Sequence, residues 1–265
     1  MREQKEEKIR NNREINMKKE NKLIRKYNYL INYIKNNIEY FIKYLKFYNK
    51  YKIKFNNFME HQEILDDSNM YDYFIPNKND IVLDIGSQYG DYALLWEKRN
   101  KSIVYSFEAL ESNFNKMVKD FKINNSKIYA YSFFIGNGEE ISYNIKWNMA
   151  INTKSENKMK TIKMDDFIFN NNIIPNIIKI DVEGFEKNVL QGLVKTLNKY
   201  NPKIIIETHS KQLRKECNDF LNENNYFQVF EGRKVILNNV FDEVVNLFYE
   251  KTNNLAGANS LAGAK

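Results

Sequence analysis

Three short runs in this chain end an apolar strand with an acidic residue. They are residues 81–90 (IVLDIGSQYG), 105–108 (YSFE) and 178–184 (IKIDVEG). In an open α/β sheet, ligands bind outside the carboxyl ends of the strands. Carboxylates at that edge can bind hydroxyl groups and positively charged groups. The three runs therefore predict a site for a nucleoside-containing, cationic ligand.

A glycine pair follows the first strand. Gly86 and Gly90 are four residues apart, and we expect them to let the backbone approach a ligand without a Cβ in the way. A dinucleotide fingerprint would need further glycines at the positions of Gln88 and Asp91. The spacing therefore disfavours a pyrophosphate ligand.

Two carboxylates flank the glycine pair. Asp84 ends the first strand and can face the ammonium and sulfonium groups of S-adenosylmethionine. Glu108 ends the next strand, 22 residues after Gly86, where a carboxylate accepts hydrogen bonds from both ribose hydroxyls. Residues 81–96 contain no lysine or arginine, whereas a phosphate ligand favours a cation or a bare helix terminus. We therefore expect S-adenosylmethionine as the cofactor.

Methyl transfer to an alcohol also needs a group that removes the hydroxyl proton. The chain has two histidines. His209 follows the fifth predicted strand, and we predict it to be the general base, oriented by Asp181 or Glu207. The alternative is that His209 only caps the following helix. His61 lies before the sheet, and we expect it at the surface without a specific partner.

A divalent ion is a second way to activate the hydroxyl, because a bound cation lowers its pKa. Four residues could hold such an ion: Asp181, Glu183, Glu207 and His209. The sequence allows a bound metal ion but does not favour one. The single cysteine, Cys217, excludes an intramolecular disulfide and a thiolate-built metal site. Cys217 lies in a helical apolar stripe, so we expect it to be buried.

Strand and helix patterns alternate through the region that carries these motifs. Strands are predicted at residues 81–85, 102–107, 127–135, 176–181 and 203–207, and helices at 89–98, 114–121, 185–197 and around Cys217. Residues 141–163 read as an irregular or hairpin-like insertion. Residues 227–230 and 235–237 flank Glu231-Gly232-Arg233, which predicts an antiparallel closing hairpin. The pattern predicts an α/β fold with a mostly parallel, doubly wound sheet.

The motifs resemble those of the FkbM-type family of S-adenosylmethionine-dependent methyltransferases over about residues 80–210. Asp84, Gly86 and Gly90 match the family's Asp-x-Gly-x-x-x-Gly pattern, and Phe107-Glu108-Ala109 matches its Phe-Glu-Pro. Met164-Asp165-Asp166 matches its Leu-Asp-Asp, and Glu207-Thr208-His209 matches its Glu-x-His. Its Lys-x-Asp-x-Glu-Gly pattern is matched by Lys179, Asp181, Glu183 and Gly184. Ala109 replaces the usual proline. Phe133 and Phe134 replace smaller residues near the expected adenine pocket.

The resemblance implies a Rossmann-like class I methyltransferase fold and an O-methyltransferase that acts on a hydroxyl of a sugar, glycan or related small molecule. The implied cofactor-binding residues are Asp84, Gly86, Ser87, Gly90, Glu108, Ala109, Phe133 and Asp181. Two alternatives stay open. One is an RNA ribose 2′-O-methyltransferase, whose basic arm would track phosphates, although nucleic acid is the less favoured partner. The other is a non-catalytic scaffold.

The N-terminal region differs in character from the rest of the chain. Residues 1–60 hold 16 lysines and arginines against 7 acidic residues, a net charge of +9, within a total of +7. The first 22 residues are polar and are expected outside any packed structure. Apolar residues then recur at heptad spacing through residues 24–48, at Ile24, Tyr27, Ile31, Ile34, Ile38, Phe41, Leu45 and Tyr48. This helix could pack on the catalytic domain, pair with a second copy as a homodimer, or lie on an anionic membrane surface.

These patterns divide the chain into three parts: a basic helical arm at residues 1–60, a methyltransferase domain at 61–250, and a tail at 251–265. The tail contains Leu-Ala-Gly-Ala twice and reads as foreign to the protein. No secretory signal begins the sequence, and no apolar run is long enough to span a bilayer. A cytoplasmic location is therefore expected.

Overall fold

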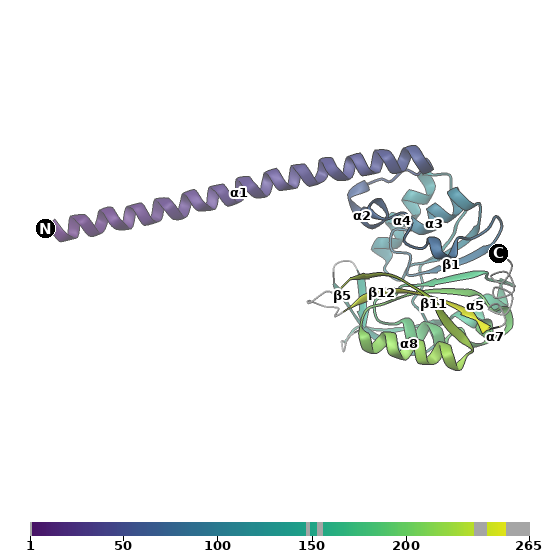
Figure 1. Ribbon diagram of the computed structural model, residues 1–265. Coiled ribbons are helices and arrows are strands. Elements are labelled where there is room, and N and C mark those ends of the chain that lie inside the picture. The colour runs from purple at the N-terminus through teal and green to yellow at the C-terminus, as the bar shows by residue number, and fades with distance from the viewer. Residues whose placement is uncertain (1, 147–148, 153–155, 236–242, 253–265) are drawn as a thin grey trace, which may run out of the picture.

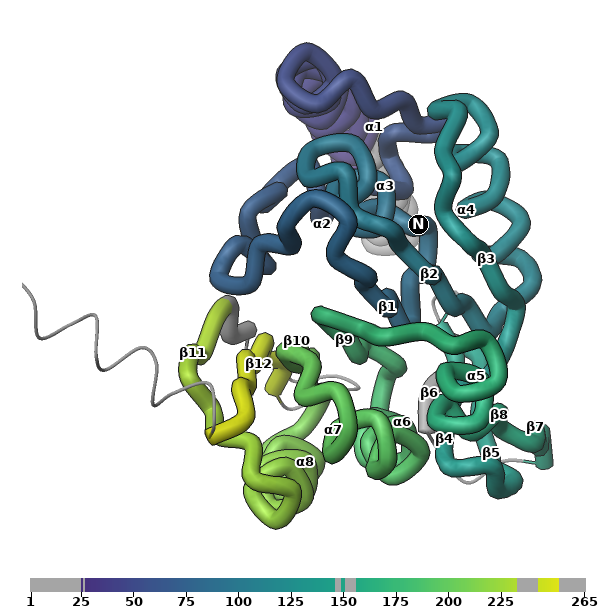
Figure 2. Tube along the Cα trace, turned by 90° about the vertical axis from the view of Figure 1, so that its right-hand side faces the viewer, coloured from purple at the N-terminus to yellow at the C-terminus, as the bar shows by residue number. Residues whose placement is uncertain are grey.

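A seven-stranded sheet forms the centre of the protein. The computed structural model describes residues 2–146, 149–152, 156–235 and 243–252. The strand order is β11-β12-β10-β9-β1-β2-β3 (Figure 2). The strands are β1 (Ile81–Ile85), β2 (Ile103–Phe107), β3 (Tyr129–Tyr131), β9 (Ile177–Ile180), β10 (Lys203–Thr208), β11 (Tyr226–Val235) and β12 (Val244–Lys251). β12 runs antiparallel to both neighbours, and the other pairings are parallel. The predicted fold class is confirmed.

Helices cover both faces of this sheet (Figure 2). One face carries α3 (Asp91–Leu95), the π-helical segment η3 (Trp96–Asn100) and α4 (Glu111–Ile123); the other carries α5 (Met164–Asn170), α6 (Glu186–Gln191), α7 (Val194–Tyr200) and α8 (Lys211–Glu223). Alternate side chains of β1 enter the two resulting cores: Val82 joins the α3–α4 core, and Leu83 and Ile85 join the α5–α8 core. Because both faces are buried, the strands read as continuous apolar runs. Cys217 is fully buried in the second core, as predicted.

The chain changes direction across the sheet at β1. It proceeds from β1 outward to β2 and β3, then crosses back to β9 on the other side of β1. The carboxyl ends of β1 and β9 therefore lie side by side, with Asp84 opposite Lys179 and Ile85 opposite Ile180. An open α/β sheet forms its ligand-binding crevice at such a switch point.

The insertion between β3 and β9 forms two small sheets. β5 (Glu140–Lys146) pairs antiparallel with β6 (Met149–Asn152) and β7 (Lys158–Lys160), and β4 (Ile135–Gly136) pairs in parallel with β8 (Ile162–Lys163). The expected hairpin-like insertion is therefore present. The strand predicted over residues 127–135 is two strands, β3 and β4. The helix predicted over 185–197 divides into α6 and α7 at Gly192, where a Cβ would lie 1.9 Å from the carbonyl oxygen of Gly136.

The closing hairpin exists, but its predicted turn was wrong. Glu231-Gly232-Arg233 lies inside β11, where the register shifts against β12 between Glu231 and Lys234. Gly232 packs there against the sheet, since a Cβ would lie 3.1 Å from the ring of Phe248. The second strand of the hairpin is β12, which runs through Lys251, so the first residue assigned to the tail belongs to the sheet. Two parts of these predictions lie outside the described residues: residues 236–237 of the second predicted strand, and residues 253–265 of the tail.

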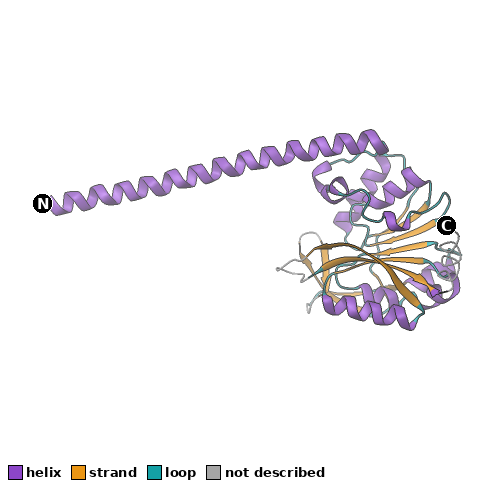
Figure 3. Ribbon diagram, in the orientation of Figure 1, coloured by secondary structure: helices purple, strands orange, loops and turns teal. Residues whose placement is uncertain are grey.

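The N-terminal helix α1 (Arg2–Tyr51) extends away from the domain (Figures 1 and 3). The helix begins at Arg2, and residues 2–22, which were expected outside any packed structure, contain no glycine or proline to end it. Only its last turns contact the domain. Tyr44 stacks on Phe58 with ring centroids 5.6 Å apart, and Lys43 Nζ lies 2.8 Å from Asp66 Oδ1. In the described part of the chain, no helix is long and apolar enough to cross a membrane.

Three short helical segments join α1 to β1: η1 (Phe58–Glu60), α2 (Gln62–Asp66) and η2 (Asp72–Phe74). His61 lies among them, and its expected surface position was wrong, because the side chain is only 1% exposed. Nδ1 contacts Asp91, Nε2 lies 2.9 Å from Asp120 Oδ2, and the ring stacks on Phe55. Burial opposes a charge on His61, but Asp91 and Asp120 outweigh it and raise its pKa to about 9. The imidazolium thus fastens the connecting segment to α3 and α4.

Gly90, just before α3, should tolerate a side chain less well than Gly138 does. Gly90 has φ +77°, and a Cβ would lie 2.5 Å from the ring of Phe121. Gly138 has φ +93°, but a Cβ there meets nothing nearer than 3.6 Å. Gly138→Ala should therefore cost only the left-handed backbone penalty, about 1–2 kcal/mol. Gly90→Ala should cost about 1–3 kcal/mol more, because it also overpacks the core.

Urea unfolding of the two variants measures this difference. Equal losses of unfolding free energy in Gly90→Ala and Gly138→Ala would contradict the packing argument.

Candidate active site

Two connected chambers open at the carboxyl ends of β1, β2 and β9. The larger, here called the apolar chamber, has a volume of about 640 Å³ including its open mouth. The smaller is called the acidic chamber. Gly86, Gln88 and Asp181 line both chambers. The apolar chamber is further lined by Phe107, Glu108, Ala109, Phe133, Phe134, Val182 and Glu183, and the acidic chamber by Glu63, Tyr71, Asp84, Ser87 and Lys179.

Glu108 lies in the wall of the apolar chamber and is 6% exposed. The backbone N–H groups of Gln88 and Leu110 each donate to one of its carboxylate oxygens at 2.9 Å. Burial raises the pKa of Glu108 to about 7, although these hydrogen bonds oppose the rise. Asn113 Nδ2 also donates to Oε1 at 3.5 Å, so it is Oε2 that keeps a second lone pair for a ligand hydroxyl.

The glycine pair is needed for packing within the protein. Gly86 has φ +82°, and a Cβ there would lie 1.7 Å from the carbonyl oxygen of Asp181. The loops after β1 and β9 can therefore touch only because residue 86 is glycine. Gly90 is constrained by Phe121, as described above. Ser87 is buried and donates its hydroxyl to the carbonyl oxygen of Asp84, which shapes the same loop.

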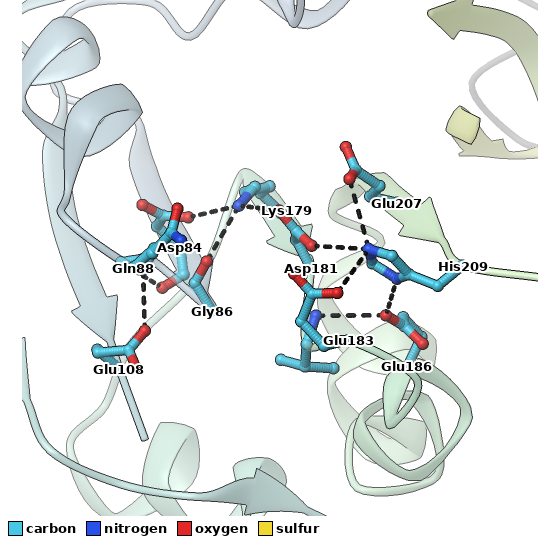
Figure 4. A network of polar contacts seen from close by, with 12 residues as sticks. Asp84, Gly86, Gln88, Glu108, Lys179, Asp181, Glu183, Glu186, Glu207 and His209 are labelled. Atoms are coloured by element: carbon cyan, nitrogen blue, oxygen red, sulfur yellow. Dashed lines mark hydrogen bonds and ion pairs between the residues drawn. The ribbon is translucent and has the colours of Figure 1, made fainter. Parts of the chain in front are cut away.

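Lys179 neutralises the acidic groups between the two chambers. Its Nζ lies 3.0 Å from Asp181 Oδ2 and 3.6 Å from Asp84 Oδ1, and it donates to the carbonyl oxygen of Gly86 at 3.2 Å (Figure 4). Burial opposes the charge on Lys179, but Asp181 and Asp84 outweigh it and raise its pKa. Burial raises the pKa of Asp84, and the charge of Lys179 opposes that rise. Asp84 therefore lies at the end of β1, as predicted. The prediction of the cofactor did not take its neighbour Lys179 into account.

His209 lies at the end of β10, inside a group of four carboxylates (Figure 4). Its Nδ1 lies 2.9 Å from Glu186 Oε1. Its Nε2 lies 3.1 Å from Glu183 Oε2, 3.5 Å from Glu207 Oε1 and 3.7 Å from Asp181 Oδ1. Burial opposes a charge on His209, but Glu186 and the other carboxylates outweigh it and raise its pKa well above the ordinary value. The ring is therefore an imidazolium at neutral pH.

Glu183 joins this group to the apolar chamber, which it lines. Its backbone has φ +55°, a left-handed conformation that costs a residue with a Cβ on the order of 1 kcal/mol or more. Burial and the surrounding carboxylates raise the pKa of Glu183 to about 8, while His209 opposes the rise. The strained turn after β9 thus holds a carboxylate of high proton affinity beside the ligand cleft.

The sequence-predicted metal candidates can be compared with this geometry. Asp181, Glu207 and His209 each offer one ligand atom, and these atoms lie within 4.8 Å of one another. Glu183 contacts the same His209 nitrogen. The arrangement can therefore accept a divalent ion, provided that the ion displaces the proton on His209 Nε2.

The structure brings the predicted residues together in two groups. Asp84, Gly86, Ser87, Glu108, Ala109, Phe133 and Asp181 line the chambers, and Asp181, Glu183, Glu207 and His209 form the histidine cluster; Gly90 stands apart in helix packing. Glu186 was missed. It is fully buried, and its Oε1 also accepts the N–H groups of Val182 and Gly184. Its position in the first turn of a helix was the only sequence signal, and that position usually indicates an exposed residue.

Comparison with known proteins gives a family match over this part of the chain. A family model described as the methyltransferase FkbM domain matches residues 84–242, more than half of the chain. The chain is 24% identical over 153 residues to the hexuronic acid methyltransferase AglP of Haloferax volcanii. That match covers 55% of this chain and 63% of AglP, which is less than two thirds of the relative's length.

Solved methyltransferase structures are similar to the chain at low identity. An FkbM methyltransferase from Methylobacillus flagellatus aligns with a TM-score of 0.48 and 17% identity, over 68% of this chain and 47% of that chain. A precorrin-6y C5,15-methyltransferase from Geobacter metallireducens aligns with a TM-score of 0.47 and 11% identity, over 70% of this chain and 84% of that chain.

The carboxylate group around His209 predicts a measurable titration. The chain has only two histidines, so each ring can be assigned by NMR from a single variant. In protein free of divalent ions, both rings should remain protonated at pH 7.5, a value chosen about one unit above the ordinary histidine pKa. Glu186→Gln should lower the pKa of His209, because it removes the buried charge on Nδ1, and should leave His61 near 9.

A His209 ring that is neutral at this pH in the wild-type protein would contradict the charge balance described here. A shift of both rings in Glu186→Gln would instead indicate a general change of structure.

Proposed function

The chain belongs to the FkbM methyltransferase family, and from this premise we propose that it transfers a methyl group from S-adenosylmethionine to a hydroxyl group of a sugar or glycan. The observation that carries the proposal is the position of Asp181, which lines both chambers and lies 3.7 Å from His209. A methyl donor bound in the chambers would therefore end beside a cluster that can handle a proton. The name of the relative AglP supports a sugar acceptor.

The two chambers suit the two ends of S-adenosylmethionine. We assign the adenosine to the apolar chamber, with the adenine near Ala109 and Phe133 and the ribose hydroxyls on Glu108. We assign the amino-acid end to the acidic chamber. Its ammonium would face Asp84, and its carboxylate would face Lys179, which supplies the positive charge among the described residues that line this chamber. The sulfonium then lies at the junction, near Asp181.

The acidic surroundings favour a neutral acceptor over an anionic one. A hexuronic acid offers both hydroxyl groups and a carboxylate. Asp181, Glu183 and Glu207 lie together at the proposed acceptor side, and they would repel a carboxylate while accepting hydrogen bonds from hydroxyls. We therefore assign a hydroxyl as the methylated group, which gives an ether rather than an ester.

The carboxylate cluster around His209 also contains the groups that could remove the hydroxyl proton. We predicted His209 as the general base, but an imidazolium already holds the proton that it would have to accept. We propose that Glu183 takes the proton instead at a pH above about 8, where its carboxyl group is ionised, since it lines the cleft and contacts His209 Nε2. His209 then positions the carboxylates of Glu183 and Glu207. As the methyl group moves from sulfur to oxygen, the protein's main contribution is alignment of the two reacting atoms.

Cofactor binding should depend on Glu108. Below pH 7 its carboxyl group becomes protonated and accepts fewer hydrogen bonds from ribose, so S-adenosylmethionine should bind more tightly at pH 8 than at pH 6. Glu108→Gln should weaken binding at pH 8 by about 10- to 100-fold, corresponding to about 1.5–3 kcal/mol for hydrogen bonds to a charged group. It should also flatten the pH dependence. Calorimetric titration measures both effects.

The exposed Glu223 on α8 provides a matched control, and Glu223→Gln should bind as the wild type does. Unchanged affinity in Glu108→Gln would remove Glu108 from the ribose site.

Transfer of a labelled methyl group to uronic-acid-containing oligosaccharides tests the reaction itself. The label should resist mild alkali, as an ether does and an ester does not. Glu183→Gln should lower kcat by about 10²- to 10⁴-fold, the usual contribution of a positioned base, while cofactor binding remains measurable.

Label released by mild alkali would overturn the hydroxyl assignment. Loss of activity in a chelator, restored by Mg²⁺, would transfer the role of Glu183 to a cation held by Asp181, Glu207 and His209. Cofactor binding without transfer to any glycan or RNA acceptor would favour a scaffold.

A further inference from the structure

Helix α1 carries an apolar stripe that the domain does not cover. The stripe consists of the described seam residues between Tyr27 and Leu45, together with the flanking Leu30 and Ile42. Many of these side chains are 42–64% exposed: Tyr27, Leu30, Ile34, Ile38, Phe41, Ile42 and Leu45. Large apolar side chains that stay exposed in a continuous row mark an interaction surface.

Most of the stripe lies on a different side of α1 from the face that contacts the domain; Phe41 lies where the two meet, with its ring centroid 5.7 Å from that of Phe58. The contact face is formed by Tyr40, Tyr44, Phe47 and Tyr51, spaced at i, i+4, i+7 and i+11. At 3.6 residues per turn, the centre of the stripe is roughly a third of a turn away from this face. Even beside the domain, Ile38 is 56% exposed and Leu45 42% exposed. The stripe is therefore not an unfinished contact with the chain's own domain.

The spacing of the stripe indicates what covers it. Its residues alternate by three and four positions, a mean of 3.5, which is the repeat of a coiled coil. Ile31 and Ile38 occupy the first core position of successive heptads, and Tyr27, Ile34 and Phe41 occupy the second, so both core positions are apolar. The flanking positions hold Asn28, Lys35 and Asn37, so like charges across a pair are few.

The energetics of an isolated helix point the same way. Helices in water gain most of their stability from packing of an apolar face, and this face is unpacked over residues 27–38. We propose that α1 forms a two-stranded coiled coil with a second copy of this chain, through Tyr27, Ile31, Ile34, Ile38 and Leu45. Since each domain is attached beside the stripe rather than on it, the two domains lie on the outer sides of the coil.

Light scattering of the full chain after gel filtration tests the proposal. The wild type should elute with twice the 31.8 kDa mass of one chain at micromolar concentration. Ile34→Glu combined with Ile38→Glu should give a monomer, because the charges enter the paired surface. Asn32→Glu combined with Asn36→Glu adds the same charge on exposed positions outside the stripe and should remain a dimer.

Two results would overturn the proposal. One is a wild-type monomer throughout the micromolar range. The other is a dimer that survives in the Ile34→Glu, Ile38→Glu variant. A monomeric wild type that co-sediments with phosphatidylglycerol vesicles would assign the stripe to a membrane surface instead.

Discussion

The arrangement of the site depends on compensation of negative charge at one edge of the sheet. The turn after β9 and the end of β10 bring Asp181, Glu183 and Glu207 together, and Glu186 adds a fully buried carboxylate behind them. Burying such groups is costly unless cations accompany them. Lys179 and His209 are those cations. Each is almost completely buried, and each contacts Asp181, so both halves of the site share one charge balance.

The topology explains why this balance forms where it does. The reversal of strand order at β1 leaves the ends of β1 and β9 adjacent, and the missing Cβ of Gly86 lets the two following loops touch. Asp84 and Lys179 are direct partners in the strand register, so their ion pair follows from the sheet itself. The helices on the two faces provide separate cores, which hold the strands without occupying the edge.

The sequence predicted those parts of the fold that local pattern determines. β1 was predicted at its observed bounds, because the largely apolar run from Ile81 to Ile85 lies between Asp80 and Gly86. The site residues at the strand ends were predicted for the same reason. Glu231-Gly232-Arg233 misled the turn prediction, since a glycine serves a bulge as well as a turn. The partners of His61 and the burial of Glu186 depend on contacts between distant segments, which spacing along the chain does not report.

The lone thiol has a practical consequence. Cys217 has no exposed surface, and burial in apolar surroundings, reinforced by Glu186, raises its pKa, so little reactive thiolate forms. Maleimide reagents should therefore spare the native protein. A cysteine introduced on the exposed side of α1 could then carry a single spin label or fluorophore without prior removal of the natural one, which makes the orientation of the long helix directly accessible to distance spectroscopy.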